Sequence, residues 1–339
     1  MRIVFLGTAA STSTANARLQ SIFLQHDDGS AALFDAGEDV QRAFEDAKIK
    51  LNKPLAIFIT HMHGDHVIGL PGLLFRFGSS NRTQDVEIYG PRGLFFYLLA
   101  HRLTVGLVTG YAIRVTEIDL VARELCSYPA LDESFTLENI ESRIVKNKIV
   151  NRVIKRAMNF QIEALEADHT TPQGFTFIFQ ELPRPGKFNP ERAISLKIPR
   201  GRAWGLMQEG NVITLKDGRI IDPLKEGIVG GPRRGRIVIL SGDTRPTETL
   251  LKYIKEHEVD LLVHEATFTS DLHELAVDRK HTTVEEACNL AKEGMVHMLA
   301  LTHFSIRYID NLNEIEKRAN EIFKGTIIAR DNLVIDLKN

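Results

Sequence analysis

The segment THMHGDH, residues 60–66, carries four side chains that bind metal ions well. His61 and His63 are two positions apart, so they can chelate the same ion. The glycine that follows lets the chain turn sharply, so Asp65 and His66 leave in another direction and can reach a second ion. One ion rarely takes four ligands from so short a loop, because tetrahedral coordination spreads its ligands in space. The spacing therefore indicates a metal site that needs further ligands from elsewhere in the chain.

Three other residues are candidates for those ligands, because each stands after an apolar run and beside glycine or threonine. They are His169 in EADHTTPQGF, Asp243 in LSGDTRP and His303 in LTHFSIRY. A lone histidine is usually a surface or hydrogen-bonded core residue, but the HxHxDH spacing favours a shared metal centre. Imidazole and carboxylate ligands without a thiolate suit catalytic zinc or manganese better than a closed structural zinc site.

The elements that must position these residues alternate along the chain. Apolar runs typical of strands occur at 2–6, 19–25, 31–36, 55–60, 237–241, 260–266 and 297–303, and TIIA and LVID close the chain. Helical patterns occur at 38–47, 246–256, 283–292 and 311–323. This alternation predicts an α/β fold with helices covering sheets. Open α/β sheets bind ligands at the carboxyl ends of their strands, where we expect the candidate residues to meet.

The composition is that of an ordinary soluble globular protein, with 339 residues, 43% hydrophobic and 25% charged. No apolar run reaches about 18 residues, so no membrane-spanning helix is expected, and the short apolar start does not predict a signal peptide. Cys126 and Cys288 are too few for a disulfide framework or a multi-cysteine zinc site. We expect them to be small buried side chains in an intracellular, cytoplasmic protein.

Two segments depart from the alternating pattern. Residues 143–156 hold six basic and no acidic side chains, on a predicted helix whose charged face is either solvated or functional. Residues 183–236 hold six of the 12 prolines, nine of the 24 glycines, twelve basic and five acidic residues. This composition excludes a continuous helix or central strand. It predicts an inserted arm with a hairpin at 211–221 that turns at Asp217-Gly218, or else a plain surface loop. Its local charge of +7, in a chain of net charge −2, favours contact with a polyanion.

The motif HMHGDH resembles that of the metallo-β-lactamase superfamily, whose fold is an αββα sandwich. Further segments resemble ribonuclease Z, the endonuclease family that matures the 3′ end of transfer RNA. They are FLGTAAS, LFDAGEDVQRAF, THMHGDHVIGLPGLL, IYGPRGL, SGDTRP, VHEATF, KHTTVEEA and LTHFSIRY, and they extend from residue 5 to residue 308. The resemblance implies an α/β metallo-β-lactamase sandwich as a single domain over 1–339, with an arm inserted at 183–236. It also implies a homodimer and a precursor tRNA substrate, with no membrane contact.

The resemblance further implies two zinc ions in each chain, although manganese suits the same ligands. One ion would be bound by His61, His63 and His169, and the other by Asp65, His66 and His303, with Asp243 bridging the two. Asp65 would also accept a proton from the attacking water.

The resemblance assigns roles to two residues outside this set of ligands, and the chemistry of phosphate binding suggests two more. His281, in KHTTVEEA, would protonate the leaving oxygen, with Glu265 of VHEATF orienting it. An alternative interpretation places His281 next to a helix cap, because TTVEEA has the form of a capping box. The two interpretations of His281, proton donor and neighbour of the cap, are compatible. Ser305 and Arg307 are candidate phosphate ligands, and a structural salt bridge is the alternative for Arg307.

The predicted arm would bind tRNA through Lys187, Arg200 and Arg202, although Arg200-Gly201-Arg202 stands where many members have a Gly-Pro step. The segments ASTSTANARLQS and FDAGED also depart from the family's usual sequences, and we expect neither to contact a proposed ligand. Two other functions remain open from the sequence. They are a small-molecule phosphodiesterase or other hydrolase on the same scaffold, and a binding protein with an inactive site.

Overall fold

The computed structural model describes residues 1–338, which form two compact units. The larger unit comprises Met1–Arg156, Ile162–Phe179 and the chain from Ile237 on. The second, which we call the insertion unit, comprises Ala157–Gln161 and Gln180–Arg236. Among the described residues, no helix is long and apolar enough to cross a membrane. Cys288 is fully buried, whereas Cys126 is only half-buried.

One sheet has nine strands in the order β18-β1-β2-β3-β4-β5-β6-β7-β8. Their bounds are β1 Arg2–Gly7, β2 Ser21–Gln25, β3 Ala31–Phe34, β4 Leu55–Phe58, β5 Val86–Gly90, β6 Ile113–Asp119, β7 Glu124–Ser127, β8 Val145–Lys148 and β18 Val334–Asp336. Strands β3 to β6 are parallel, and the other pairs in this sheet are antiparallel. The carboxyl ends of β3 and β4 therefore lie at the same edge.

The other large sheet has seven strands in the order β17-β16-β15-β14-β11-β10-β9. Their bounds are β9 Val153–Arg156, β10 Phe160–Glu166, β11 Phe175–Glu181, β14 Ile237–Leu240, β15 Leu261–Glu265, β16 Leu299–Thr302 and β17 Ile327–Ile328. Strands β14 to β17 are parallel. The two sheets meet through aromatic rings, because Phe177 of β11 lies 6.0 Å from Phe34 of β3 and 5.5 Å from Phe58 of β4.

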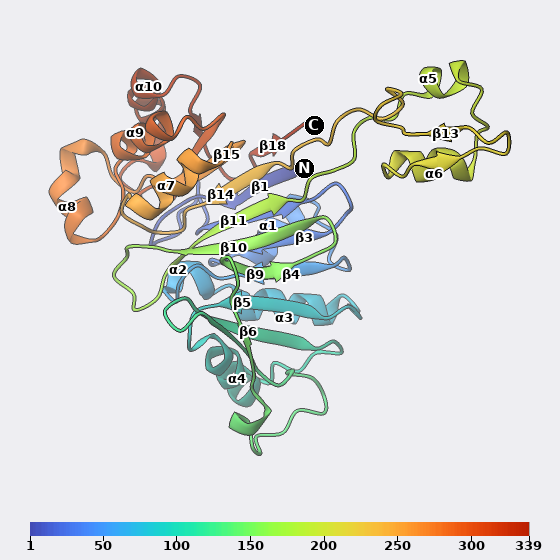
Figure 1. The fold of residues 1–339 in the computed structure, drawn as a ribbon. Coiled ribbons are helices and arrows are strands. Elements are labelled where there is room, and N and C mark those ends of the chain that lie inside the picture. The colour runs from blue at the N-terminus through green and yellow to red at the C-terminus, as the bar shows by residue number, and fades with distance from the viewer. Residues whose placement is uncertain (339) are drawn as a thin grey trace. The chain divides into compact units, whose positions relative to one another are not determined.

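Helices cover the outer face of each sheet (Figure 1). Those on the nine-stranded sheet are α1 Val40–Asp46, α3 Leu70–Ser79 and α4 Leu94–Val105, and their apolar residues join one core cluster with β1 and β3 to β6. Those on the seven-stranded sheet are α7 Glu248–Glu256, α9 Val284–Gly294 and α10 Leu312–Ile322, which share a second cluster. Two short helices are α2 Gly64–Val67 and α8 His273–Asp278, and 3-10 turns lie at Glu141–Arg143, Ser270–Leu272 and Ile309–Asn311. The predicted αββα sandwich is confirmed.

The insertion unit has its own small core and secondary structure. Its elements are α5 Pro190–Ser195, α6 Arg202–Gln208, β12 Ile213–Thr214 and β13 Ile220–Ile221. Strands β12 and β13 pair as the predicted hairpin, and Gly218 takes a φ of 87° in its turn, a backbone conformation that favours glycine. One cluster of buried apolar residues in this unit consists of Ala193, Ile198, Met207, Ile221, Ile228 and Val229. At its base, Arg184 and Arg233 exchange backbone hydrogen bonds of 3.0 and 2.9 Å.

The helix predicted over residues 143–156 is wrong. A 3-10 turn, β8 and β9 occupy this segment, with a turn at Asn151 and Arg152, which have φ angles of 51° and 65°. Repeated valine and isoleucine disfavour a helix and favour strands, and this outweighed the charge pattern. Several of its cations are paired: Lys146 and Lys148 with Glu124, Arg152 with Glu163, and Lys155 with Glu87.

Candidate metal centre and active site

The candidate ligands lie in loops that follow strands of both sheets, as predicted. His61 and His63 follow β4, and His63 directly precedes α2, whose single turn carries Asp65 and His66. The change of direction between the two pairs comes from the start of this helix. The glycine between them, Gly64, has no positive φ, and a Cβ atom at this position would meet no other atom within 4 Å. The sharp glycine turn expected from the sequence is therefore wrong.

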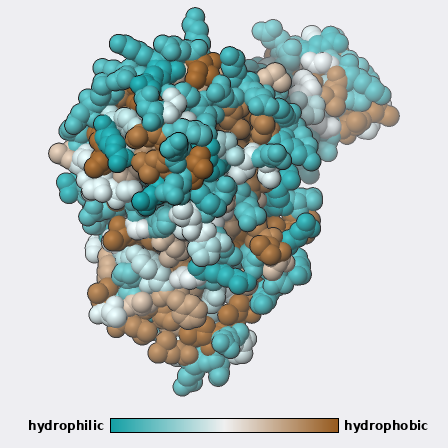
Figure 2. All heavy atoms as spheres, turned by 90° about the vertical axis from the view of Figure 1, so that its left-hand side faces the viewer, coloured by the Kyte–Doolittle hydropathy of each residue, from teal (hydrophilic) through white to brown (hydrophobic). Residues whose placement is uncertain are grey.

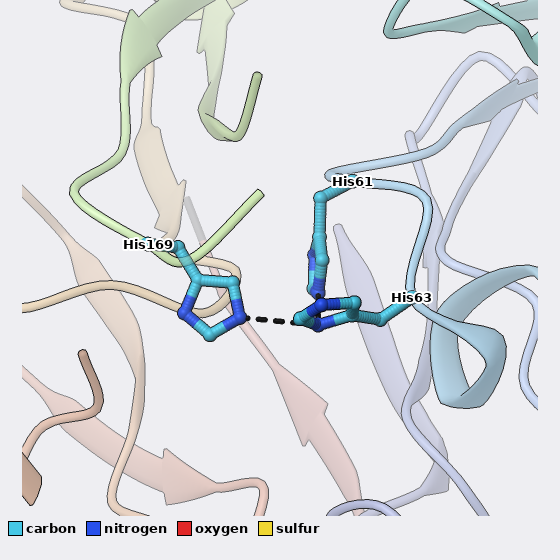
Figure 3. Close-up of side chains that lie close together, drawn as sticks. All are labelled: His61, His63 and His169. Atoms are coloured by element: carbon cyan, nitrogen blue, oxygen red, sulfur yellow. Dashed lines mark hydrogen bonds between the residues drawn. The ribbon is translucent and has the colours of Figure 1, made fainter. Parts of the chain in front are cut away.

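Three histidine nitrogens converge at one point of the centre (Figure 3). His63 Nδ1 lies 3.0 Å from His61 Nε2 and 3.2 Å from His169 Nε2. Tetrahedral zinc with nitrogen ligands at its usual bond length separates neighbouring ligand atoms by about 3.3 Å. His63 Nδ1 therefore stands from both other atoms at about the spacing that one such ion requires, and all three residues fall in one potential metal-binding group.

A second group of side chains lies beside the first. His66 Nε2 is 3.3 Å from His303 Nε2, and Asp65 Oδ2 is 3.4 Å from the same atom of His303. Asp243 stands between the two groups. Its Oδ2 atom lies 3.4 Å from His66 Nε2, 3.8 Å from His61 Nε2 and 3.9 Å from His169 Nε2. The structure thus brings all seven predicted ligands together.

Four of the five histidines use their second nitrogen on a protein partner, which fixes the orientation of the ring. The partners are Thr60 Oγ1 for His61 at 3.0 Å, Asp35 Oδ2 for His66 at 2.7 Å, the Lys280 carbonyl for His169 at 3.0 Å, and Thr267 Oγ1 for His303 at 2.9 Å. This support makes the donor set suitable for metal ions without rearrangement. None of these partners was predicted from the sequence.

Asp35 is the most important of the missed residues. It is 2% exposed, and its carboxylate accepts hydrogen bonds from the backbone and hydroxyl of Thr60 as well as from His66. Asp35 belongs to FDAGED, which was expected not to contact a proposed ligand, so that expectation is wrong. It is also wrong for ASTSTANARLQS, because the backbone N–H of Ser11 donates to Asp65 Oδ2 at 2.7 Å.

A close backbone contact explains how FDAGED reaches the ligands. The carbonyl of Ala36 accepts from the N–H of Gly69, just before α3, and the N–H of Ala36 donates to the carbonyl of His66. A Cβ atom on Gly69 would stand 1.9 Å from the carbonyl oxygen of Gly37, so only glycine permits this approach. The packing of these two loops places Asp35 against the ring of His66.

The electrostatics of the cluster suit cation binding. Burial lowers the pKa of His61 and of His63, which keeps their imidazoles neutral and able to ligate. Burial alone would raise the pKa of Asp243, but the surrounding histidines hold it well below its usual range. Burial lowers the pKa of His66, yet the carboxylates of Asp243 and Asp35 raise it well above its ordinary value. A cation at this position would replace the proton of His66.

His281 and Glu265 form a second functional pair next to the ligands. His281 Nδ1 donates to Glu265 Oε1 at 2.9 Å, and Glu265 is 1% exposed. Burial lowers the pKa of His281, but the carboxylates of Glu265 and Asp243 raise it to about 9. The predicted capping box is also present, from Thr283 to Glu286 at the start of α9, directly after His281. His281 also falls in potential metal-binding groups, with Asp243 and His169 or with Glu265 and His303.

A cavity of about 630 Å³ opens onto these residues. Its lining includes His63, Asp65, His281 and the two predicted phosphate ligands, Ser305 and Arg307. Ser305 is 8% exposed, and the guanidinium of Arg307 is exposed and lies 6.0 Å from the ring of Phe268. Within residues 1–338, Arg307 has no carboxylate at salt-bridge distance, so the structural salt bridge considered for it is absent.

The three predicted RNA contacts of the insertion unit, Lys187, Arg200 and Arg202, are all exposed. The guanidinium of Arg200 lies 5.4 Å from the Trp204 ring, which packs on Phe188 with a centroid distance of 5.0 Å. Arg200, Trp204 and Phe188 therefore form a basic and aromatic cluster within the unit.

Known proteins are similar to this chain over its full length. "Ribonuclease Z" of Nitrosopumilus maritimus is 36% identical over 338 residues, covering 100% of both chains. "Ribonuclease Z" of Methanosarcina acetivorans is 32% identical, covering 99% of this chain and 98% of that protein. The chain belongs to the ribonuclease Z family.

Solved structures similar to this ribonuclease Z family member have the same fold. The short form of human tRNase Z matches with a TM-score of 0.64 and 22% identity, covering 100% of both chains. A metallo-beta-lactamase fold protein, YhfI of Bacillus subtilis, matches with a TM-score of 0.60 and 17% identity, covering 98% of both. Residues 1–180 also match the model of the family described as the anti-Pycsar protein Apyc1, so the chain belongs to that family through this half. Asp243, His281 and His303 lie outside the matched half.

Proposed function

We propose that this member of the ribonuclease Z family is an endoribonuclease that removes the 3′ trailer from precursor tRNA. The products would be a tRNA with a 3′-hydroxyl and a trailer with a 5′-phosphate. The observation that carries the proposal is that one cavity is lined both by members of the histidine–carboxylate cluster and by His281, which Glu265 holds from behind. This combination can both attack a phosphodiester and protonate its leaving oxygen.

We further propose two metal ions in each chain, with zinc as the working metal and manganese as the alternative. The spacing of the ligand atoms and the neutral His61 and His63 support this assignment. The chemistry that such a pair supplies when bound is polarisation of the phosphodiester and a water nucleophile at neutral pH.

The protein groups then have separate roles in the proposed reaction. Asp65 accepts a proton from the attacking water, although its pKa is well below the usual range because the hydrogen bond from His303 and nearby imidazoles outweigh its burial. His281 holds Glu265 with Nδ1, which leaves Nε2 to give its proton to the leaving 3′ oxygen. Ser305 and Arg307 bind the phosphate oxygens from the cavity wall.

We propose that the insertion unit binds the tRNA through its exposed cations, including Lys187, Arg200 and Arg202. Such binding would follow backbone phosphates and weaken as salt concentration rises. The local excess of basic residues supports this role. A cytoplasmic location is part of the same proposal, because both cysteines are unpaired thiols.

We also propose that two copies of the chain form a homodimer, in which the insertion unit of one serves the site of the other. Support comes from the apolar side chains that α4 leaves in solvent, since Phe96 is 56% exposed and Leu103 and Val105 are each 59% exposed. Figure 2 shows hydrophobic atoms in the lower part of the larger unit, at the height where Figure 1 places α4. Light scattering under assay conditions tests the dimer, and monomers alone in an active sample would contradict it.

The central experiment is incubation of a 3′-extended tRNA with the protein, with and without a chelator, followed by mapping of both product ends. We expect cleavage beside the folded acceptor stem that stops on chelation and returns with zinc. The cavity volume also falls in the range of small-molecule sites, so a small phosphodiester is assayed in parallel. Turnover of that compound without any cleavage of the RNA would contradict the proposed substrate.

A further inference from the structure

Arg245 makes a set of contacts that the proposed mechanism does not use. It lies two residues beyond Asp243, in the loop after β14, and its guanidinium is half-buried. Its Nη1 atom donates to the carbonyl of His281 at 2.6 Å and to Glu286 Oε2 at 2.7 Å. Its Nη2 atom donates to the other oxygen of Glu286. One planar group therefore ties the backbone of His281 to the first turn of α9.

The backbone around Arg245 adds two further ties. The N–H of Arg245 donates to the carbonyl of Asp168 at 2.9 Å, and the N–H of Asp168 donates to Thr244 Oγ1 at 3.0 Å. The N–H of Thr244 donates to Glu265 Oε1 at 2.8 Å, the oxygen that also holds His281. Arg245 thus stands where the loops of His169, Asp243 and His281 meet.

Glu286 is itself held in place. It is the third residue of α9, and its carboxylate accepts hydrogen bonds from the backbone and hydroxyl of Thr283 at 2.9 and 3.0 Å. Burial alone would raise the pKa of Glu286, but the bonds from Arg245 and Thr283 lower it below its ordinary value. The carboxylate therefore stays ionised and gives Arg245 a fixed, charge-assisted anchor on the helix.

We propose that Arg245 and Glu286 are positioning residues for His281 in the reaction proposed above. Glu265 sets the rotation of the imidazole, whereas Arg245 sets where the backbone of His281 stands relative to the metal ligands. A forked guanidinium can hold a carbonyl and both carboxylate oxygens at once, which a lysine ammonium cannot do with the same geometry. A small displacement of a proton donor lowers the rate steeply, so this tie has a catalytic consequence.

Two substrates distinguish loss of activity through a displaced proton donor from loss of activity through a damaged metal centre. Cleavage of precursor tRNA expels a poor leaving group that needs a proton, whereas bis(p-nitrophenyl) phosphate expels p-nitrophenolate, which does not. We expect Arg245→Lys and Glu286→Gln to lower kcat on the tRNA about 10- to 100-fold, with KM nearly unchanged. Hydrolysis of the aryl ester and the bound zinc content should stay within about twofold of the unaltered protein.

A coupling measurement and a matched control complete the test. In a His281→Ala background, Arg245→Lys should cause no further loss on tRNA, because its partner in catalysis is gone. Arg318→Lys alters another salt bridge to α9, with Glu285, and should leave both activities unchanged. Equal losses on both substrates, or an undiminished loss in the His281→Ala background, would overturn the positioning role. Absence of tRNA cleavage by the unaltered protein would instead contradict the proposed function, so the two failures are distinguishable.

Discussion

The histidine–carboxylate cluster and the insertion unit differ in the burial of their functional side chains. In the cluster, five of the seven predicted ligands are buried, and four of the seven have a second hydrogen bond to a protein partner. In the insertion unit, the cations are exposed, and a few apolar residues hold the backbone together. Side chains that must hold ions at fixed distances are kept in place by packing in the core. Side chains that bind an RNA backbone need only positive charge and access to the phosphates.

The largest effect should come from Asp243→Ala, which removes the carboxylate shared by both ligand groups. We expect cleavage of precursor tRNA and of bis(p-nitrophenyl) phosphate to fall together below detection, because both depend on the same centre. Zinc content by elemental analysis should fall in parallel. Retention of two ions with full activity on either substrate would contradict the bridging role.

Removal of the insertion should affect only one of the two substrates. Arg184 and Arg233 exchange backbone hydrogen bonds, so residues 185–232 can be replaced by Asn-Gly, which forms a tight two-residue turn. We expect a large loss of tRNA cleavage and near-normal hydrolysis of the aryl ester. The triple change Lys187→Ala, Arg200→Ala, Arg202→Ala should give a smaller loss.

The salt dependence of the triple variant sharpens this result. Each lost phosphate contact should reduce the slope of log affinity against log salt by about one. Lys252→Ala, at an exposed position on α7, is a matched control for loss of a surface cation. An unchanged slope in the triple variant would show that these cations do not meet the RNA.

Asp35→Asn tests whether a residue that hydrogen-bonds to a proposed ligand contributes to zinc affinity. Its buried carboxylate orients His66, so we expect zinc affinity to fall about 10- to 100-fold. Competition with a chromogenic zinc chelator measures this effect. Asp278→Asn, an exposed aspartate, is the control and should bind zinc normally.

The smallest expected effect is a shift in pH dependence for Glu265→Gln. The pKa of His281 is raised to about 9, and the proposed reaction needs its protonated form, so kcat should fall as pH rises through that value. Loss of the Glu265 charge should lower this pKa and move the alkaline limb of the kcat profile to lower pH. An unmoved limb would contradict the assignment of His281 as the proton donor.

The residue pattern alone predicted an α/β fold and the seven candidate ligands that the structure brings together, whereas the αββα sandwich followed from the family resemblance. Apolar periodicity marked the main strands and helices of both halves, such as Ile237–Leu240 and Glu248–Glu256, because local burial dictates the pattern. The ligands could be grouped because each follows such a strand. The resemblance to a known family then assigned His281 and Glu265, which spacing alone did not connect.

The partners of the ligands could not be predicted because they depend on distant loops. Asp35 is 31 positions from His66, and the Lys280 carbonyl is 111 positions from His169. A backbone carbonyl carries no signal in the sequence. The wrong prediction at 143–156 has another cause. The basic residues suggested the charged face of a helix, whereas the repeated valine and isoleucine favour strands.

The order of the proposed ligands along the chain has a consequence for protein synthesis. The first is His61 and the last is His303, and the group of Asp65, His66 and His303 contains residues from both halves of the sequence. A nascent chain that has not yet emerged beyond β16 lacks His303, so its second group is incomplete. The centre can therefore assemble only after His303 has been synthesised, and we expect nascent chains that end before this residue to lack the proposed cleavage activity.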